Sequence, residues 1–457
     1  MDQLDATGGR RDFLTSLRES PPLAWAFLYF FFLLTGYYVL RPVRDALGAS
    51  SDVEAVFPAA AVDWAAGHGI ALGELTLQLL FTATFIAMLL LQPVYGWLVA
   101  RYPRRVFLPT VYVLFIACLL GFYFAFDLRL TGRGFAFFVW VAVFNLFAVS
   151  VFWSFMSDIF RDSEARRFYG YIAAGGTLGG LTGPLITRLL VERIGVPNLL
   201  LVSAALLALC IVCILRLRGW AARREALRGP SAEPRIIGGT VLAGLRLTAR
   251  DPLLRAMVLL MFFGVGTLLY NEQREIALAW FDNAEERTAY YSLLDLAINF
   301  LTLVMQLGIT RALLSRYGVG PLLMIPVIVV TVGFALLSAS PLPLLVAGVQ
   351  VVTRAGNFAL IQPARESVFT RVDRESRYKA KAFIDTAVYR GGDLSFVWLH
   401  KLLAGLGSAA VFAAGLLVAL AMTASAWQVV RRQRGRTDLR EQPPVAATAG
   451  PVAGGAA

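Results

Sequence analysis

The chain has few of the residues that metal sites, disulfides and acid–base pairs require. Its 457 residues include three cysteines and two histidines. Cys118, Cys210 and Cys213 all lie within apolar stretches, which excludes a disulfide framework and a zinc site. His68 and His400 are far apart in the sequence, and no Ser/His/Asp set can be assembled. We therefore expect no enzyme activity, no metal and no cofactor.

Phosphate-binding loops are also missing. The sequence has no G-x-x-x-x-G-K-[ST] motif, which excludes ATP hydrolysis as an energy source. The run GGTLGG at residues 175–180 lies in an apolar stretch and does not follow a strand, so it is not a dinucleotide-binding fingerprint.

Charge is scarce as well. Charged residues make up 16% of the chain and hydrophobic residues 58%, whereas soluble domains have about 25% and about 45–50%. The chain is therefore expected to be a membrane protein with the lipid bilayer as its surroundings. Its formal charge is +12, but the basic residues fall in short turns and not along one soluble face, which excludes nucleic acid as a partner.

Twelve apolar stretches are long enough, at roughly 20 residues each, to cross the hydrocarbon of a bilayer. They fall at residues 23–45, 73–100, 106–126, 134–159, 169–190, 198–217, 255–281, 290–314, 319–340, 342–368, 380–403 and 407–430. We predict an all-α membrane protein with twelve transmembrane helices. The predicted parts are a cytoplasmic segment (1–22), a six-helix bundle (23–217), a connecting loop (218–254) with an amphipathic helix around 236–248, a second six-helix bundle (255–430) and a disordered cytoplasmic tail (431–457).

Lysine and arginine gather in alternate turns, for example at Arg101, Arg104 and Arg105. Basic turns stay in the cytoplasm. We therefore expect a multi-pass protein of a bacterial inner membrane, with both termini cytoplasmic, and we expect it to be a monomer.

Two turns with the same charge pattern indicate that the chain is duplicated. The matching positions of RDSEARRF and VDRESRYK are Asp162, Glu164 and Arg166 in the first turn and Asp373, Glu375 and Arg377 in the second. Because other markers keep their order in both halves, we predict parallel repeats related by an axis along the membrane normal. The paired turns either lock an inner gate or form only weak ion pairs in water.

Charged and amide side chains interrupt three apolar stretches of the second half, where hydrocarbon makes them costly unless they face a partner or a water-filled cavity. At 100° per residue they gather on one face of each expected helix. These residues are Arg354, Asn357 and Arg365 with Gln362 at the margin, then Asp385, Tyr389 and Asp393 with Arg390 nearby, and Asp295, Asn299, Thr302 and Gln306. We predict that they bind substrate or couple its movement.

Arg354 lies near the middle of its stretch. Its guanidinium fork can form two directed, charge-assisted bonds with a phosphate or carboxylate. The alternative is a buried salt bridge with Asp295, Asp385 or Asp393, which would hold the second half together.

A further polar group marks the matching ends of the first and seventh stretches. It consists of Arg41, Arg44 and Asp45 in one half and Asn271, Glu272, Arg274 and Glu275 in the other. Opposite charges at twin positions would form an outer gate that breaks as the halves rock, or the arginines and Asn271 would contact an anion in the cavity. Alternatively, the long arginine side chains only reach the membrane interface.

Two halves of six stretches, a basic central loop and short basic turns after the second stretch of each half resemble the major facilitator superfamily. Within it, YYVLRPVRDALG, FWSFMSDIFRDSEARRFYGYIAAGG and above all PARESVFTRVDRESRYKAKAFIDTAVYRGGD resemble bacterial relatives of the ATP/ADP translocase (nucleotide transporter) family. The resemblance covers residues 21–430. The chain has Arg41 and Arg44 where the translocases carry lysines.

A second motif is similar to one found in antiporters of that superfamily. Gly170, Gly179, Gly183 and Pro184 form G-x8-G-x3-G-P, with Thr187 where a final glycine is expected. The same spacing also serves ordinary close packing of two helices through small residues.

The resemblance implies a secondary transporter that works by alternating access and exchanges nucleotides such as ATP and ADP, or related organic phosphate anions, with arginines on the phosphates. One alternative is a proton-coupled transporter of another small solute, in which Asp295, Asp385 and Asp393 titrate. Another is a non-transporting membrane protein for envelope assembly or ligand sensing, with a closed cavity and a fully paired Arg354.

Overall fold

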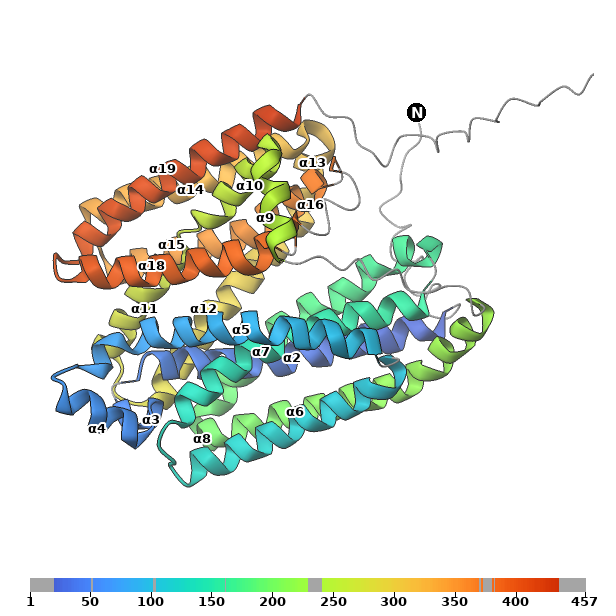
Figure 1. The fold of residues 1–457 in the computed structure, drawn as a ribbon, viewed down its shortest axis with the longest axis horizontal. Coiled ribbons are helices and arrows are strands. Elements are labelled where there is room, and N and C mark those ends of the chain that lie inside the picture. Colours follow the sequence, from blue (N-terminus) through green and yellow to red (C-terminus); the bar gives the residue numbers. More distant parts are fainter. Residues whose placement is uncertain are drawn as a thin grey trace, which may run out of the picture.

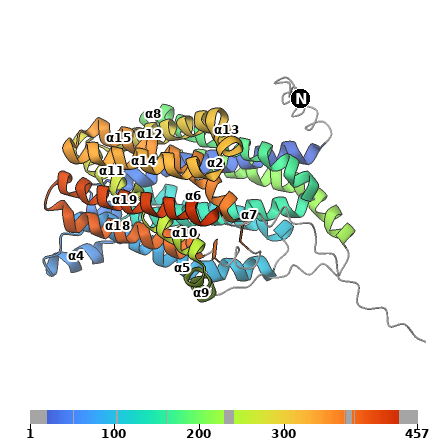
Figure 2. The ribbon, with the colours of Figure 1, turned by 90° about the horizontal axis from the view of Figure 1, so that it is seen from above.

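The computed structural model describes residues 20–50, 52–101, 104–160, 162–228, 241–369, 371–372, 380–381 and 383–434, and these ranges are helical with short connections. The helices form two groups that run along the long axis of the molecule (Figure 1 and Figure 2). The first group consists of α2 (Pro21–Gly48), α3 (Val53–Val56), α4 (Ala59–Gly67), η1 (Leu72–Leu75), α5 (Thr76–Arg101), α6 (Arg104–Asp127), α7 (Arg133–Ile159) and α8 (Asp162–Arg228). We call this group the first half.

The second half follows a short helix, α9 (Val241–Arg250), close to where the sequence predicts an amphipathic helix. Its helices are α10 (Pro252–Phe262), α11 (Gly266–Trp280), α12 (Ala284–Met305), α13 (Arg311–Tyr317), α14 (Val319–Ala339), α15 (Pro343–Gly356), α16 (Gln362–Phe369), α18 (Tyr389–Ala404) and α19 (Ser408–Gln433). Three π-turns join some of them: η2 (Gln306–Thr310), η3 (Asn357–Ile361) and η4 (Ile384–Val388).

Ten segments among the described residues are long and apolar enough to cross a membrane. One of these segments, Phe168–Trp220, is two helices joined at Gly195, where φ is 75°. Separating those two helices and adding α18, which has only 16 residues, gives the twelve predicted spans. The helix α8 continues to Arg228, beyond the predicted end of the first bundle.

The seventh span is interrupted, although its sequence predicts one continuous helix. Residues 263–265 separate α10 from α11, and Gly264 and Gly266 lie at the break. Glycine has a low helix propensity because it loses the most backbone freedom on folding. Broken helices inside membranes occur where the exposed backbone borders a cavity.

Pro184 lies inside α8, and a side chain from the other half takes the place of the hydrogen-bond donor that it lacks. Pro184 has no N–H with which to bond the carbonyl of Gly180 four residues earlier. The Nδ2 of Asn299, on α12, donates to that carbonyl at 2.7 Å. This bond therefore connects the two halves through a backbone group that Pro184 leaves free.

The same arrangement occurs within the second half. Pro363 cannot donate to the carbonyl of Ala359, which lies in the π-turn η3. The hydroxyl of Thr310 lies 3.0 Å from that carbonyl oxygen. Pro363 thus gives a physical reason for the π-turn. The Thr310 hydroxyl lies 3.0 Å from the Met305 carbonyl oxygen as well, so its one proton serves both carbonyls, including the one that Pro363 frees.

Glycines allow α2 and α8 to pack closely. A Cβ at Gly179 would lie 2.6 Å from the carbonyl oxygen of Phe31, and one at Gly183 would lie 2.7 Å from that of Thr35. Gly170, the first glycine of the predicted motif, has nothing within 4 Å of such an atom. The motif is therefore a packing surface from Gly179 onward, which supports the small-residue interpretation.

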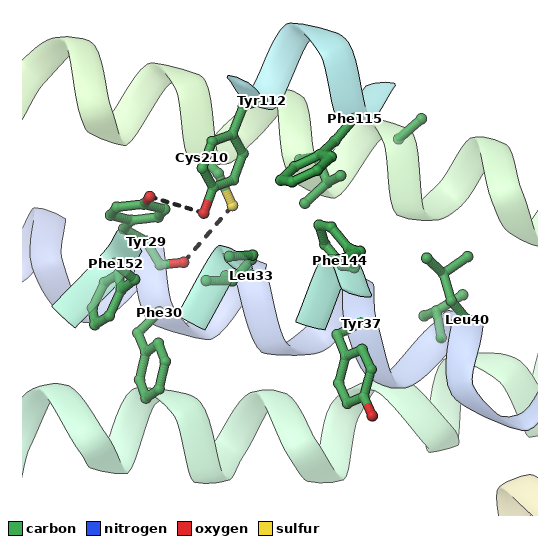
Figure 3. Close-up of a cluster of buried hydrophobic side chains, with 14 of the residues drawn as sticks. Tyr29, Phe30, Leu33, Tyr37, Leu40, Tyr112, Phe115, Phe144, Phe152 and Cys210 are labelled. Carbon is green, nitrogen blue, oxygen red and sulfur yellow. Dashed lines mark hydrogen bonds between the residues drawn. The ribbon is translucent and has the colours of Figure 1, made fainter. Parts of the chain in front are cut away.

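Aromatic rings fill the core of the first half (Figure 3). The hydroxyl of Tyr29 donates to that of Tyr112 at 2.8 Å, and Cys210 Sγ lies 3.8 Å from the Tyr29 carbonyl. Cys210 and Cys213 are buried free thiols, which confirms that they are part of the core.

Candidate functional site

A cavity of about 420 Å³ lies between the two halves. Residues of α2, α11, α15 and α18 line it, together with the break between α10 and α11. Its charged lining residues are Arg41, Arg44, Arg354, Arg390 and Asp393. We call it the main cavity. The arginines come from both halves, so an anion in it would contact the first half and the second half at once.

Asp295, on α12, is shared between two of these arginines. Its Oδ1 lies 3.1 Å from Arg41 Nη1 and 3.5 Å from Arg354 Nη1. The Arg41 side chain is only 8% exposed, whereas that of Arg354 is 21% exposed. Arg41 therefore forms a short cross-half ion pair, and Arg354 is the more loosely held and more accessible guanidinium.

Asp45 forms the second charge cluster of the cavity wall. Its Oδ1 lies 2.6 Å from Arg44 Nη2 and accepts a bond of 3.1 Å from the hydroxyl of Tyr270, on α11. Arg41 Nε lies 3.9 Å from the other oxygen. Asp45 thus links α2 to the second half, and its charge offsets part of the positive charge of Arg41 and Arg44.

Asp393, on α18, forms the third charge cluster, beside the break in the seventh span. It accepts a 2.6 Å bond from the Thr267 hydroxyl at the beginning of α11 and lies 3.4 Å from Arg390 Nη1. The four arginines and the three aspartates leave one positive charge in excess. The three acids of this set are Asp45, Asp295 and Asp393. Because Asp45 and Asp295 are only 2% exposed, the arginines present most of the accessible charge.

Polar groups of α15 complete the wall. The Gln350 Oε1 and the Thr353 Oγ1 are buried and have no hydrogen-bond partner among the described residues, and both residues line the main cavity. A buried polar atom without a partner is costly. A ligand or water in the cavity would supply the missing bonds.

A second cavity of about 220 Å³ continues from the first, because six residues line both. Those residues are Met261, Asn357, Phe358, Ile361, Tyr389 and Arg390. Arg365 also lines it, and its Nη1 lies 2.9 Å from Asp385 Oδ1. We call it the side chamber.

A model of the Major Facilitator Superfamily matches residues 46–396. The chain belongs to the Major Facilitator Superfamily. It is therefore a multi-pass secondary transporter in a lipid bilayer and not an enzyme, as the sequence predicts. Both the predicted fold and the predicted superfamily are confirmed.

One similar protein is ADP,ATP carrier protein 1 of Chlamydia muridarum (strain MoPn / Nigg), which is 25% identical over 465 residues. The match covers 88% of this chain and 85% of the carrier. This distant relative agrees with the resemblance to the translocase family that the sequence motifs indicate.

Solved structures agree on the fold. The POT family transporter PepTSo has a TM-score of 0.61 at 11% identity, with 91% of this chain and 98% of that chain covered. The nucleoside transporter NupG has a TM-score of 0.58 at 14% identity, with 90% and 97% covered. A D-xylose-proton symporter has a TM-score of 0.57 at 13% identity, with 88% and 96% covered. At these identities the likeness concerns the major facilitator fold alone.

Most of the predicted substrate residues of this major facilitator protein line the main cavity or the side chamber. Arg41, Arg44, Arg354, Asn357, Tyr389, Arg390 and Asp393 line the main cavity, and Arg365 and Asp385 line the side chamber. Asp295 forms ion pairs with Arg41 and Arg354. Asn299 donates a hydrogen bond to the carbonyl of Gly180 on α8. For Arg354, cavity exposure and pairing with Asp295 occur together, so the two interpretations are not exclusive.

Asn271, Arg274 and Glu275 lie elsewhere, near the end of α2. Arg274 donates 3.0 Å bonds to the carbonyls of Gly48 and Gly73, and its Nη1 lies 2.7 Å from Glu275. Asn271 bonds a carbonyl of its own helix. Arg44 and Arg274 each form an ion pair with the acid that follows it in the sequence. The twin positions therefore do not form ion pairs with each other across the two halves.

Further contacts join the halves at this Gly48 end. Lys401 Nζ lies 2.7 Å from Glu74 Oε2, and the Gln78 Nε2 donates to the carbonyl of Val397 at 3.3 Å. Together with Arg274, these contacts tie α5 to α18 and α2 to α11. The two halves are therefore held together at the Gly48 end of the main cavity.

The predicted inner gate cannot be followed in the structure. Glu164 is half-buried on α8. Asp373, Glu375 and Arg377 lie outside the described residues, and so do the side chains of Asp162 and Arg166. Their role stays a prediction.

Two features escaped the sequence analysis. Glu272 and His400 form a buried pair in which His400 Nε2 lies 2.9 Å from Glu272 Oε1, joining α11 to α18. Two residues so far apart give no signal in a single sequence. Gln362 lines the side chamber although its predicted place was the margin of the polar face, and Pro363 was the signal for the π-turn that moves it.

Proposed function

We propose that this major facilitator transporter exchanges nucleotides, or related organic phosphate anions, across the bacterial inner membrane. The observation that carries the proposal is the accessible guanidinium of Arg354, in a cavity that presents arginines from both halves. The distant likeness to the chlamydial ADP,ATP carrier supports nucleotides over other anions. Tight binding of a polyanion requires such a cluster in a water-poor site.

The loose pairing of Arg354 suits reversible binding. A phosphate oxygen competes with Asp295, whose oxygen is 3.5 Å away and also pairs with Arg41. When phosphate takes over Arg354, Asp295 keeps Arg41 as its partner, so no buried carboxylate is left unpaired. Arg354 can therefore bind and release a substrate at small energetic cost.

The main cavity alternates between the two sides by rocking of the halves. The positive-inside rule assigns the Gly48 end to the outer face. Opening at that face requires separation of Arg41 from Asp295, Asp45 from Tyr270, and the Arg274 contacts.

Uptake of labelled ADP into proteoliposomes tests the proposal, with and without ADP inside the vesicles. Exchange predicts uptake only with internal nucleotide. Replacing Arg354 with Gln removes a charged hydrogen bond of about 1.5–3 kcal/mol, so kcat/KM should fall roughly 10- to 150-fold. Arg188→Gln is the matched control, because Glu192 is the only ion-pair partner of Arg188 among the described residues and the Arg188 side chain is 43% exposed.

Two results would point elsewhere. Uptake driven by a pH gradient into vesicles without internal nucleotide, and lost in Asp385→Asn, would support proton coupling; the Asp385 side chain is 35% exposed. No uptake of any phosphate compound under either condition would reject nucleotide exchange. A cavity lined by Arg354, whose side chain is 21% exposed and only loosely paired, speaks against the non-transporting alternative, which required a closed cavity and a fully paired Arg354.

A further inference from the structure

The side chamber differs in chemistry from the main cavity, although the two are continuous. Arg365 is 9% exposed and its guanidinium already lies 2.9 Å from Asp385. Arg390 lies where the chamber meets the main cavity and is paired with Asp393 at 3.4 Å. Much of the remaining wall is apolar and aromatic, with Phe85, Met88, Leu89, Leu146 and Phe358. The chamber therefore suits a flat, uncharged group better than a second phosphate.

Two amide side chains interrupt this apolar wall. Asn357 and Gln362 both line the chamber, and neither side chain has a hydrogen bond to any described residue. Each amide offers one donor group and one acceptor. They are thus free to bond the edge of a ligand that enters between the aromatic residues.

The π-turn explains why both amides face the chamber. In a regular helix Gln362 would be rotated by roughly 80° from Arg354. A π-turn adds about one residue to a turn, so the residues after it rotate back by roughly 100°. Because η3 spans residues 357–361, Gln362 returns to the face of Arg354 and Asn357.

We propose that the side chamber holds the nucleobase of the substrate, with Asn357 and Gln362 reading its edge while the arginines of the main cavity hold the phosphates. This assignment rests on the proposed nucleotide exchange. Asn and Gln amides pair bidentately with the N6 and N7 edge of adenine, and aromatic faces stack on any base. The chamber therefore selects adenine nucleotides over pyrimidine nucleotides and over phosphates that have no base.

Competition at the wild-type protein gives the first test. Proteoliposomes loaded with ADP take up labelled ADP, while unlabelled ADP, UDP, ribose 5-phosphate or pyrophosphate competes outside. ADP should compete at concentrations at least tenfold lower than the other three. Equal competition by ribose 5-phosphate would overturn the base chamber and leave organic phosphate exchange in place.

Gln362→Leu gives the second test, because it removes the amide and keeps the bulk of the side chain. KM for ADP should rise about tenfold, towards the value for UDP, while KM for UDP and the inhibition by pyrophosphate stay unchanged. Gln428→Leu makes the same chemical change on α19, outside both cavities, and should change none of these values. Thermal melting of each variant in detergent shows whether it is folded.

Each further outcome decides the inference. If Gln362→Leu fails to fold, Gln362→Met and Asn357→Leu make the same comparison, and the wild-type competition series stands without them. Unchanged ADP selectivity in folded variants of both amides would overturn the assignment but not nucleotide exchange. Wild-type protein that exchanges no phosphate compound would overturn both.

Discussion

Asn299→Ala removes the bond that links α12 to α8. The Asn299 Nδ2 donates to the carbonyl of Gly180 at 2.7 Å, and Pro184 has taken away that carbonyl's usual donor. An unpaired buried carbonyl costs about 1–3 kcal/mol, and bonds between membrane helices average about 0.6 kcal/mol with a maximum near 1.7. With Asn299 only 9% exposed, we expect a loss of about 1.5 kcal/mol in the free energy of unfolding.

A double-mutant cycle with Pro184→Ala isolates the cause. Alanine at position 184 restores an N–H four residues after Gly180, so the carbonyl gains a donor from its own helix. In that background Asn299→Ala should cost only about 0.5 kcal/mol, which gives a coupling of about 1 kcal/mol between the two positions.

Unfolding in mixed micelles, with SDS as denaturant and tryptophan fluorescence as the signal, measures each free energy. Asn198→Ala is the control, because the Asn198 amide bonds the Ile194 carbonyl across the kink at Gly195, a contact that involves neither Gly180 nor Pro184. Its cost should be the same in both backgrounds. If the effects of Asn299→Ala and Pro184→Ala add to within about 0.5 kcal/mol, the carbonyl is not what couples them and the reasoning is wrong.

Two further stability predictions follow from the packing, and both use the same unfolding measurement. Thr310→Val removes the hydroxyl beside the carbonyl of Ala359 and should lower the free energy of unfolding by about 1–3 kcal/mol. Thr310→Ser keeps the hydroxyl and should retain most of the stability. Equal losses in the two variants would contradict the role of the hydroxyl. Gly179→Ala places a methyl group 2.6 Å from the Phe31 carbonyl oxygen and should lower the free energy of unfolding by about 1–3 kcal/mol. Gly170 has open space around it, so Gly170→Ala should not lower the free energy of unfolding. Similar values for both variants would mean that α2 and α8 move apart freely.

Apolar runs and charge patterns predicted the helices well, because a span of roughly 20 residues depends only on composition and length. They missed the break at residues 263–265 and the three π-turns. These features depend on local hydrogen bonding, which periodicity does not record. Pro363 could have indicated one of them, since a proline inside a helix always frees a carbonyl.

The residues of the cavities could be predicted for a physical reason. Charges within apolar spans such as Arg354 and Asp393 must face one another or water, and both line the main cavity. Their pairing could not be predicted, because one sequence does not show which helices are neighbours. Asn271 and Arg274 are residue types that are common in binding sites, so the sequence predicted that they contact substrate. They lie at the Gly48 end instead, where each side chain donates a hydrogen bond to a backbone carbonyl.

The two halves share sequence markers but differ in stiffness. The backbones of α2 and α8 approach each other so closely at Gly179 and Gly183 that the two helices cannot slide past each other. They therefore form one rigid unit. In the part of the chain that the structure describes, every widened turn and the interrupted seventh span belong to the second half. We therefore expect the two halves to move differently during transport. The first half should move as a rigid unit, and the second half should bend at its π-turns and at the break in the seventh span.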